Sequence, residues 1–240
     1  MQMSKYIITF TKNGYIKYTS HLDMVRLFER VFKRGDIRLA YSHGFNPHPK
    51  MVFAQPLSLG YTAEAELLEI ETKEHYETGD LLKRISDLMP AGIGITSVEQ
   101  LPDNVMNQAI HTVASCVEAA DFTLEIPMDR PLSVDLGELC EKFMSQESIL
   151  VKKKQKKRKY EYKEVDIRPL ILEISGFEEL KKNPETGEVD NKIILKTKLA
   201  QGSHGNLSLE LLIPPFLSFA GLSVDRSDIE ICRNRLILTE

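Results

Sequence analysis

Residues 39–57, LAYSHGFNPHPKMVFAQPL, carry two histidines, an Asn-Pro step and a lysine within one short loop. A second polar group stands upstream, where Ser20 and His21 open a helical pattern. Backbone N–H groups at a helix start favour a phosphate, and imidazoles that titrate near neutral pH can bind it or move its protons. If the two segments converge, they form a ligand or phosphate site from Ser20, His21, Asp23, His43, Asn46, His48 and Lys50.

Four interpretations of this cluster stay open. The simplest is structural: Ser20 and Asp23 cap the helix, His21 and His43 fix local hydrogen bonds, and the prolines stiffen a turn. The second is a phosphate or RNA-backbone site. A metal site has suitable side-chain types but no recognised ligand spacing, and acid–base catalysis is the fourth alternative. We assign no metal ligand and no catalytic residue to this chain.

Two basic segments predict contacts with a polyanion. The helix has cations in line on one face, which is either a solvated surface or an RNA contact: Arg26, Arg30, Lys33 and Arg34. Residues 152–163 read KKKQKKRKYEYK, and like charges this dense repel one another unless an anion binds. The alternative is a charge-protected surface hairpin. The predicted RNA contacts, with tyrosines for base stacking, are Lys152, Lys153, Lys154, Lys156, Lys157, Arg158, Lys159, Tyr160 and Tyr162.

The composition is that of an ordinary globular protein, with 42% hydrophobic and 28% charged residues among 240. The net charge of −4 disfavours a generic nucleic-acid binder, so the distribution of charge has to carry any RNA contact. The three cysteines are scattered and lack the spacing of a metal or iron–sulfur site. No stretch has the length of a membrane span, which predicts a cytoplasmic protein without a membrane partner.

The hydrophobic periodicity predicts an α+β protein. The first half reads as β-α-β-β-α-β, with strands expected at 5–11 (resumed at 15–19), 50–57, 66–72 and 92–101. The acidic strand 64–71 alternates Glu with Leu or Ile, so we expect it to face solvent on one side. The second half repeats the pattern, with a short helix interrupted at Pro214-Pro215. Two tandem ferredoxin-like (βαββαβ) domains with antiparallel sheets are predicted, at 1–110 and 118–240.

The segment KYTSHLDMVRLFERVFKRGDIRLAYSHGFNPHPKMVFAQPLSLG, followed by EAELLEIE, resembles the radical SAM-linked family of uncharacterised bacterial domains. The later KEVDIRPLI resembles the same family. The resemblance implies a radical SAM protein encoded nearby as partner and a neighbourhood of RNA or ribosome genes. Because this sequence lacks the radical SAM cysteine triplet, the resemblance implies a stand-alone accessory form with no cofactor of its own.

These observations predict an accessory protein of a radical SAM enzyme that binds RNA, either tRNA or rRNA, and presents substrate. One alternative is a stand-alone RNA-processing or RNA-modifying enzyme that uses a histidine. The other is a protein-interaction module with the acidic strand as its docking edge. Salt-dependent RNA binding, RNA turnover lost with one histidine, and absence of RNA affinity distinguish the three.

Overall fold

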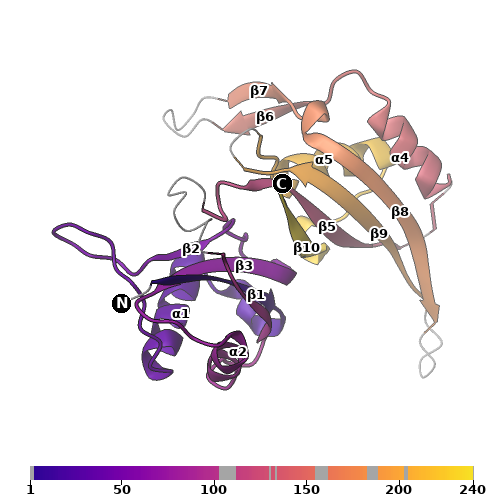
Figure 1. The fold of residues 1–240 in the computed structure, drawn as a ribbon. Helices are drawn as coiled ribbons and strands as arrows, with labels where there is room; N and C mark the ends of the chain where they lie inside the picture. The colour runs from indigo at the N-terminus through magenta and orange to yellow at the C-terminus, as the bar shows by residue number, and fades with distance from the viewer. Residues whose placement is uncertain are drawn as a thin grey trace. The chain divides into compact units, whose positions relative to one another are not determined.

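The computed structural model describes residues 3–102, 112–129, 131–132, 134–154, 162–182, 189–202 and 205–239. The chain forms two compact units, Met1–Val117 with Arg233–Glu240, and Glu118–Cys232 (Figure 1). Both combine helices with mostly antiparallel strands, as expected for an α+β protein, and the described residues include four α-helices. None of these helices is long and apolar enough to span a membrane.

The first unit is built on a sheet in the order β4-β1-β3-β10, with β2 also paired to β3. The pairs β1–β4, β1–β3 and β2–β3 are antiparallel. Two helices, α1 and α2, pack their apolar residues against its strands. The elements of this unit are β1 (Ser4–Lys12), the 3₁₀ helix η1 (Gly14–Tyr18), α1 (His21–Arg34), β2 (Met51–Phe53), β3 (Thr62–Thr72), α2 (Thr78–Ser86), β4 (Ile93–Gln100) and β10 (Glu230–Leu238), which belongs to it from Arg233 onward.

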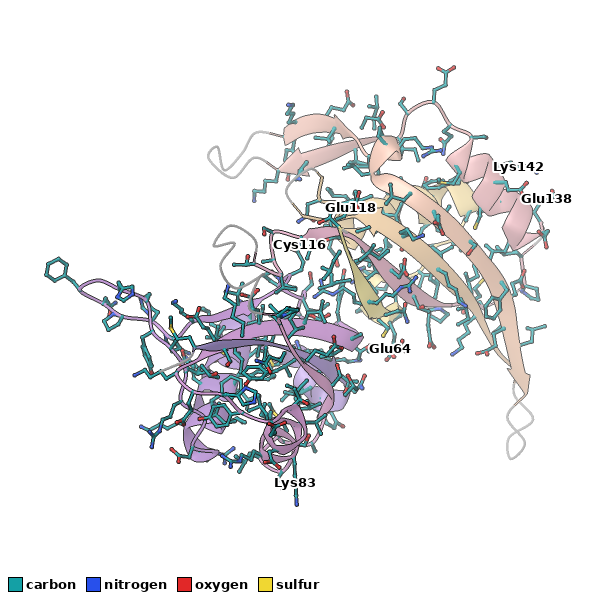
Figure 2. The ribbon with its side chains drawn as sticks, viewed as in Figure 1. Glu64, Lys83, Cys116, Glu118, Glu138 and Lys142 are labelled. Carbon is teal, nitrogen blue, oxygen red and sulfur yellow. The ribbon has the colours of Figure 1, made fainter. Side chains whose placement is uncertain are left out.

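The second unit has an antiparallel sheet in the order β5-β9-β8 and a separate two-stranded ladder, β6-β7. Glu138 and Lys142 project from its first helix, α4, into the open (Figure 2). The elements are β5 (Val117–Pro127), α4 (Leu136–Met144), β6 (Leu150–Lys154), β7 (Tyr162–Asp166), η2 (Arg168–Leu170), β8 (Ile171–Lys182), β9 (Val189–Ala200), α5 (Leu209–Ala220) and η3 (Arg226–Asp228).

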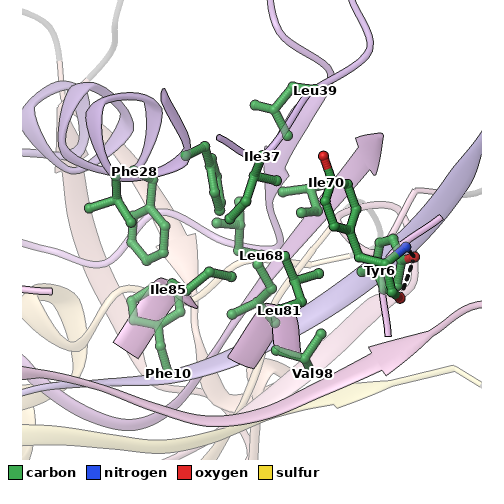
Figure 3. Packing of buried hydrophobic residues seen from close by; sticks show 14 of the residues in the cluster. Tyr6, Phe10, Phe28, Ile37, Leu39, Leu68, Ile70, Leu81, Ile85 and Val98 are labelled. Carbon is green, nitrogen blue, oxygen red and sulfur yellow. Dashed lines mark hydrogen bonds between the residues drawn. The ribbon is translucent and has the colours of Figure 1, made fainter. Parts of the chain in front are cut away.

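The core of the first unit follows from the two-residue period of β1. Tyr6, Ile8 and Phe10 alternate toward the helices and are almost fully buried. Figure 3 shows Tyr6 and Phe10 in the resulting core. The ring centroids of Phe10 and Phe28 lie 5.1 Å apart, which locks the middle of α1 onto the sheet. With that face of α1 fixed by packing, its polar side chains are held at the surface.

Two local expectations were wrong. Residues 15–19 do not resume a strand, because the η1 turn is held by the Lys12 ammonium, which donates to the Lys17 and Thr19 carbonyls at 3.3 and 3.1 Å. Likewise, Pro214 and Pro215 lie inside α5 and do not interrupt it. Each proline removes one helical N–H, but burial of neighbouring side chains such as Phe216 outweighs the loss.

The acidic strand was also predicted wrongly. Glu66, Glu69 and Glu71 are at most 9% exposed, so this part of β3 does not face solvent. Each carboxylate has a cation beside it, from Arg233, Lys5 and Lys50 respectively. The alternation of Glu with Leu or Ile could not predict that these glutamates are buried, because the cations beside them come from distant parts of the chain.

The Arg233–Glu66 pair is the most buried of these, with side chains 2% and 5% exposed. The guanidinium donates from Nε to Glu66 Oε1 at 2.7 Å and from Nη2 to Oε2 at 2.5 Å. Its Nη2 also donates to the Gln55 carbonyl at 2.7 Å. This two-pronged geometry ties the C-terminal strand to β3 and to the segment after β2.

Replacing Arg233 should be severely destabilising, because Glu66 would keep a buried charge without its partner. We expect Arg233→Met to lower the free energy of unfolding by about 3–5 kcal/mol, measured by urea denaturation. The double variant Arg233→Met/Glu66→Leu should recover most of that loss. The exposed Lys142–Glu138 pair is the control, and Lys142→Ala should cost at most about 0.5 kcal/mol. Equal losses for Arg233→Met and Lys142→Ala would contradict the argument.

Candidate nucleic-acid interface

A groove of about 630 Å³ opens beside the C-terminal half of α1 in the first unit. It is formed by the end of that helix, the connection that follows it, and the residue after β3. We call it the basic groove, and it is lined by Glu29, Arg30, Phe32, Lys33, Asp36, Ile37, Arg38, Leu39, Tyr41, Pro49 and Lys73.

The chain turns sharply at the end of α1 to build this groove. Asp36 has a positive φ of 50°, and the Ile37 N–H donates back to the Phe32 carbonyl at 2.9 Å. Arg38 then runs alongside the residue that follows β3, since the Lys73 N–H donates to the Arg38 carbonyl at 2.8 Å. The turn therefore brings two cations distant in sequence to the same wall.

Positive charge dominates the groove. Arg30, Lys33, Arg38 and Lys73 are all exposed, against two acidic side chains, Glu29 and Asp36. Arg38 is partly neutralised, with its Nε 4.0 Å from Asp36 and 3.7 Å from Glu74.

Three of these cations are open to a ligand. Among the described residues, Arg30, Lys33 and Lys73 make no salt bridge, and Lys73 lies over the Tyr41 ring at 5.7 Å from its centroid. These groups can accept an anionic ligand without first breaking an internal pair.

A second hollow, of about 290 Å³, continues the positive surface and is lined by Leu27, Arg30, Lys33 and Arg34. It shares Arg30 and Lys33 with the basic groove. The guanidinium of Arg34 donates to the Leu88 carbonyl at 3.0 Å. Arg26, the fourth predicted cation, lines neither hollow and pairs with Asp23 at 3.3 Å. Three of the four residues predicted for this helix face therefore border one track.

The start of α1 confirms the predicted cap. Ser20 Oγ accepts the Asp23 N–H at 3.2 Å and donates to the Asp23 carboxylate at 2.7 Å. That hydroxyl hydrogen bond is the main cause that lowers the pKa of Asp23. His21 packs edge-on against Phe53, with centroids 5.3 Å apart, and borders a cavity of about 20 Å³. Such a volume holds about one water and is too small for a phosphate.

The histidine loop, residues 41–49, extends away from the body of the first unit (Figure 1). Tyr41 and Pro49 pair at its base, and His43, Asn46 and His48 are exposed along it. Lys50 is anchored to Glu71 at 2.8 Å. The structure thus separates the predicted cluster. The base of the loop joins the basic groove beside the C-terminal half of α1, whereas Ser20, His21 and Asp23 lie at the other end of that 14-residue helix.

In the second unit, the β6-β7 ladder carries the described part of the basic run. Lys152, Lys153 and Lys154 face Glu164, Lys163 and Tyr162, and the side chains are exposed. Lys153 directly opposite Lys163 is unfavourable without an anion. The other predicted residues of the run lie outside the described residues: Lys156, Lys157, Arg158, Lys159 and Tyr160.

Two residues of the groove, Tyr41 and Lys73, and one buried cation, Lys12, were not predicted from the sequence. Lys73 directly follows β3, and Tyr41 stands two residues before His43. Lys12 is 3% exposed, and burial lowers its pKa despite the nearby Glu66. Its position at the inward period of β1 was a signal that it lies inside.

Of the three free cysteines, Cys140 is buried, and Cys116 and Cys232 are partly exposed. Burial raises the pKa of the Cys140 thiol to about 11, so it is protonated at neutral pH. Within the described ranges, no three His, Cys, Asp or Glu side chains group as metal ligands.

Fold and site together define a mixed α+β protein with a basic groove on one unit and a basic ladder on the other. The model of a family described as uncharacterised proteins conserved in bacteria (DUF2344) matches residues 5–209. The chain belongs to this family. A search of curated proteins gave no match.

The hydrogen bond between Ser20 and Asp23 predicts a pH-dependent cap. Ser20→Ala should raise the pKa of Asp23 toward 3.8 and remove roughly 1 kcal/mol of stability at pH 7. Because the folded pKa of Asp23 is lowered, its contribution is present above the unfolded value and is lost as pH falls through the folded value. Carboxyl NMR titration measures the shift, and urea denaturation at pH 7 and below pH 3.8 measures the loss.

Ser208→Ala is the matched control, since Ser208 caps α5 by accepting the Glu210 N–H and no aspartate interacts with its hydroxyl in a described contact. It should cost stability without this pH dependence. An unchanged pKa of Asp23 in Ser20→Ala would contradict the assignment.

Proposed function

We propose that this protein binds RNA (tRNA or rRNA) and presents it to a radical SAM enzyme encoded nearby. The observation that carries the RNA part is the basic groove, where four exposed cations border a hollow of about 630 Å³. The radical SAM part rests on the SHLD and GFNPHP segments and their resemblance to the radical SAM-linked family. Membership in a family conserved in bacteria is compatible with it.

The groove suits a phosphate backbone for electrostatic reasons. Arg30 and Lys33 lie on consecutive turns of α1, so their charges follow one helix edge into the adjoining hollow. Successive phosphates of one strand can meet successive cations along such a track, and each neutralised phosphate releases a condensed counterion. A chain with net charge −4 can bind RNA only where its cations are concentrated in this way.

The β6-β7 ladder supports the same function from the second unit. Facing like charges at Lys153 and Lys163 cost stability, and an RNA phosphate between them would convert that cost into attraction. Tyr162, on the same ladder opposite Lys154, offers an exposed ring. This arrangement is that of a cationic ribbon with an aromatic contact.

The element order favours a ferredoxin-like origin for both units, which we include in the proposal. In the first unit the chain runs β1-α1-β2-β3-α2-β4, with β1 and β3 adjacent and β2 and β4 beside them. In the second it runs β5-α4-β8-β9-α5 and enters β10, of which Glu230–Cys232 belong to this unit, with the β6-β7 ladder inserted after α4. Sheets of this kind can display RNA-contacting groups on a rigid frame, but the fold alone does not imply that function.

RNA binding should depend on the groove cations and on salt. The double variant Arg30→Gln/Lys33→Gln should lose at least about tenfold in affinity for a single-stranded RNA at low salt. The slope of log affinity against log salt should fall by about 1.4, because two phosphate contacts are lost. Fluorescence anisotropy with a labelled RNA across a salt titration measures both quantities.

The double variant Lys83→Gln/Lys142→Gln removes the same net charge outside the groove, from α2 and α4, where both side chains point outward (Figure 2). It should keep nearly the wild-type affinity. Equal losses in both double variants would show that only net charge matters, and the groove would not be the site. RNA shortened during the assay would favour the histidine-dependent enzyme instead.

The partner can be tested separately from the RNA. Co-expression with the radical SAM protein encoded nearby should give a complex that survives size-exclusion chromatography, and RNA should co-elute with it. Ribonuclease treatment shows whether the two proteins contact each other directly. Separate elution of the two proteins, with and without RNA, would contradict the accessory role.

A further inference from the structure

The histidine loop carries an aromatic side chain, Phe45, that is not packed into the core. Phe45 is fully exposed, although burying a phenylalanine side chain is worth about 1.5–3 kcal/mol. The described hydrogen bonds of the loop lie at its base, where the Ser42 N–H donates to the His48 carbonyl at 2.9 Å and the His48 N–H donates to Ser42 Oγ at 3.0 Å. The tip from Gly44 to Pro47 is thus presented outward by a fixed stem.

The stem is rigidly attached to the sheet. The Ala40 N–H donates to the Glu71 carbonyl at 2.7 Å, and the Lys50 N–H donates to the Ala40 carbonyl at 2.8 Å. The Lys50 ammonium holds the buried Glu71 carboxylate at 2.8 and 3.0 Å. Both ends of the loop are therefore pinned to β3, so the position of the stem and of Tyr41 relative to the basic groove is set by the fold.

A second exposed ring stands where the loop meets the groove. Tyr41 lines the basic groove, is 48% exposed, and has the Lys73 ammonium 5.7 Å from its centroid. The Cα atoms of Tyr41 and Phe45 can lie at most about 14 Å apart, since the two residues are four positions apart in the sequence. About four stacked nucleotides cover that span. The loop and groove thus place two rings and a row of cations along one short path.

We infer that this path binds unpaired nucleotides, whose bases stack on Tyr41 and Phe45 while the groove cations hold their phosphates. The inference rests on the proposed RNA function and names its substrate class: a single-stranded end, loop or bulge. Bases inside a duplex are stacked on each other and cannot reach a protein ring, whereas unpaired bases can be splayed onto one. A protein partner would explain the exposed Phe45 alone, but four exposed groove cations beside Tyr41 favour nucleic acid.

Two leucine variants test the rings. Phe45→Leu and Tyr41→Leu keep an apolar side chain but lose the aromatic face, and each should weaken binding of an unstructured 12-nucleotide RNA roughly five- to hundredfold. Affinity for a duplex of the same sequence, and the salt slope for the single strand, should change little. Tyr15→Leu is the matched control, because Tyr15 is 94% exposed on η1 and lines neither the groove nor the loop.

The chain has no tryptophan, which gives a direct probe of stacking. In the Phe45→Trp variant, the fluorescence of its single indole should be quenched by the unstructured RNA and remain unchanged with the duplex. The Tyr15→Trp variant should show no quenching with either RNA. These spectra report contact at the ring itself and do not depend on a change in overall affinity.

The outcomes distinguish base stacking on Tyr41 and Phe45 from the proposed RNA binding by the groove cations. If the wild-type protein binds neither RNA in a salt-dependent manner, the proposed function fails and the inference fails with it. If it binds RNA through Arg30 and Lys33 but Phe45→Leu and Tyr41→Leu bind the single strand as tightly as wild type, only the inference fails. Equal losses on single strand and duplex would also overturn it.

Discussion

The burial of three carboxylates on β3 is the constraint on which the first unit depends. A buried carboxylate without a cation costs several kcal/mol, so each glutamate requires its partner in place. Glu66 requires Arg233 of β10, Glu69 takes Lys5 of β1, and Glu71 takes Lys50 after the histidine loop. The same strand therefore fixes the C-terminal segment, its neighbour in the sheet and the stem of the loop.

This constraint connects the interior to the surface proposed to bind RNA. Glu71 holds Lys50, and the pairing of Tyr41 with Pro49 sets the loop beside the groove. On the other side, packing of Phe28 against Phe10 orients α1, so that Arg30 and Lys33 face outward. Lys50 and Arg233 neutralise buried glutamates, whereas the cations of the groove wall are not paired in this way. The acidic protein therefore keeps a cationic surface at the groove.

Local sequence signals predicted the parts of the structure that local forces decide. Ser20 and Asp23 identified the start of α1, and the β-branched and aromatic residues of 5–11 identified a strand. Sequence patterns could not show that Glu66 is buried, because its partner is 167 residues away. For the same reason the candidate cluster around His21 was assembled from segments that the fold places at opposite ends of α1. Tyr41 and Lys73 join the groove through chain reversal after Asp36, which spacing along the sequence does not reveal.

The return of Arg233–Glu240 to the first unit has a consequence for biosynthesis. A ribosome makes residues 118–232 between the two parts of this unit, which at about 5–20 residues per second takes on the order of 10 s. During that interval the nascent first unit has Glu66 without its arginine and β3 without one neighbouring strand. Its completion is therefore a late event that follows synthesis of the second unit.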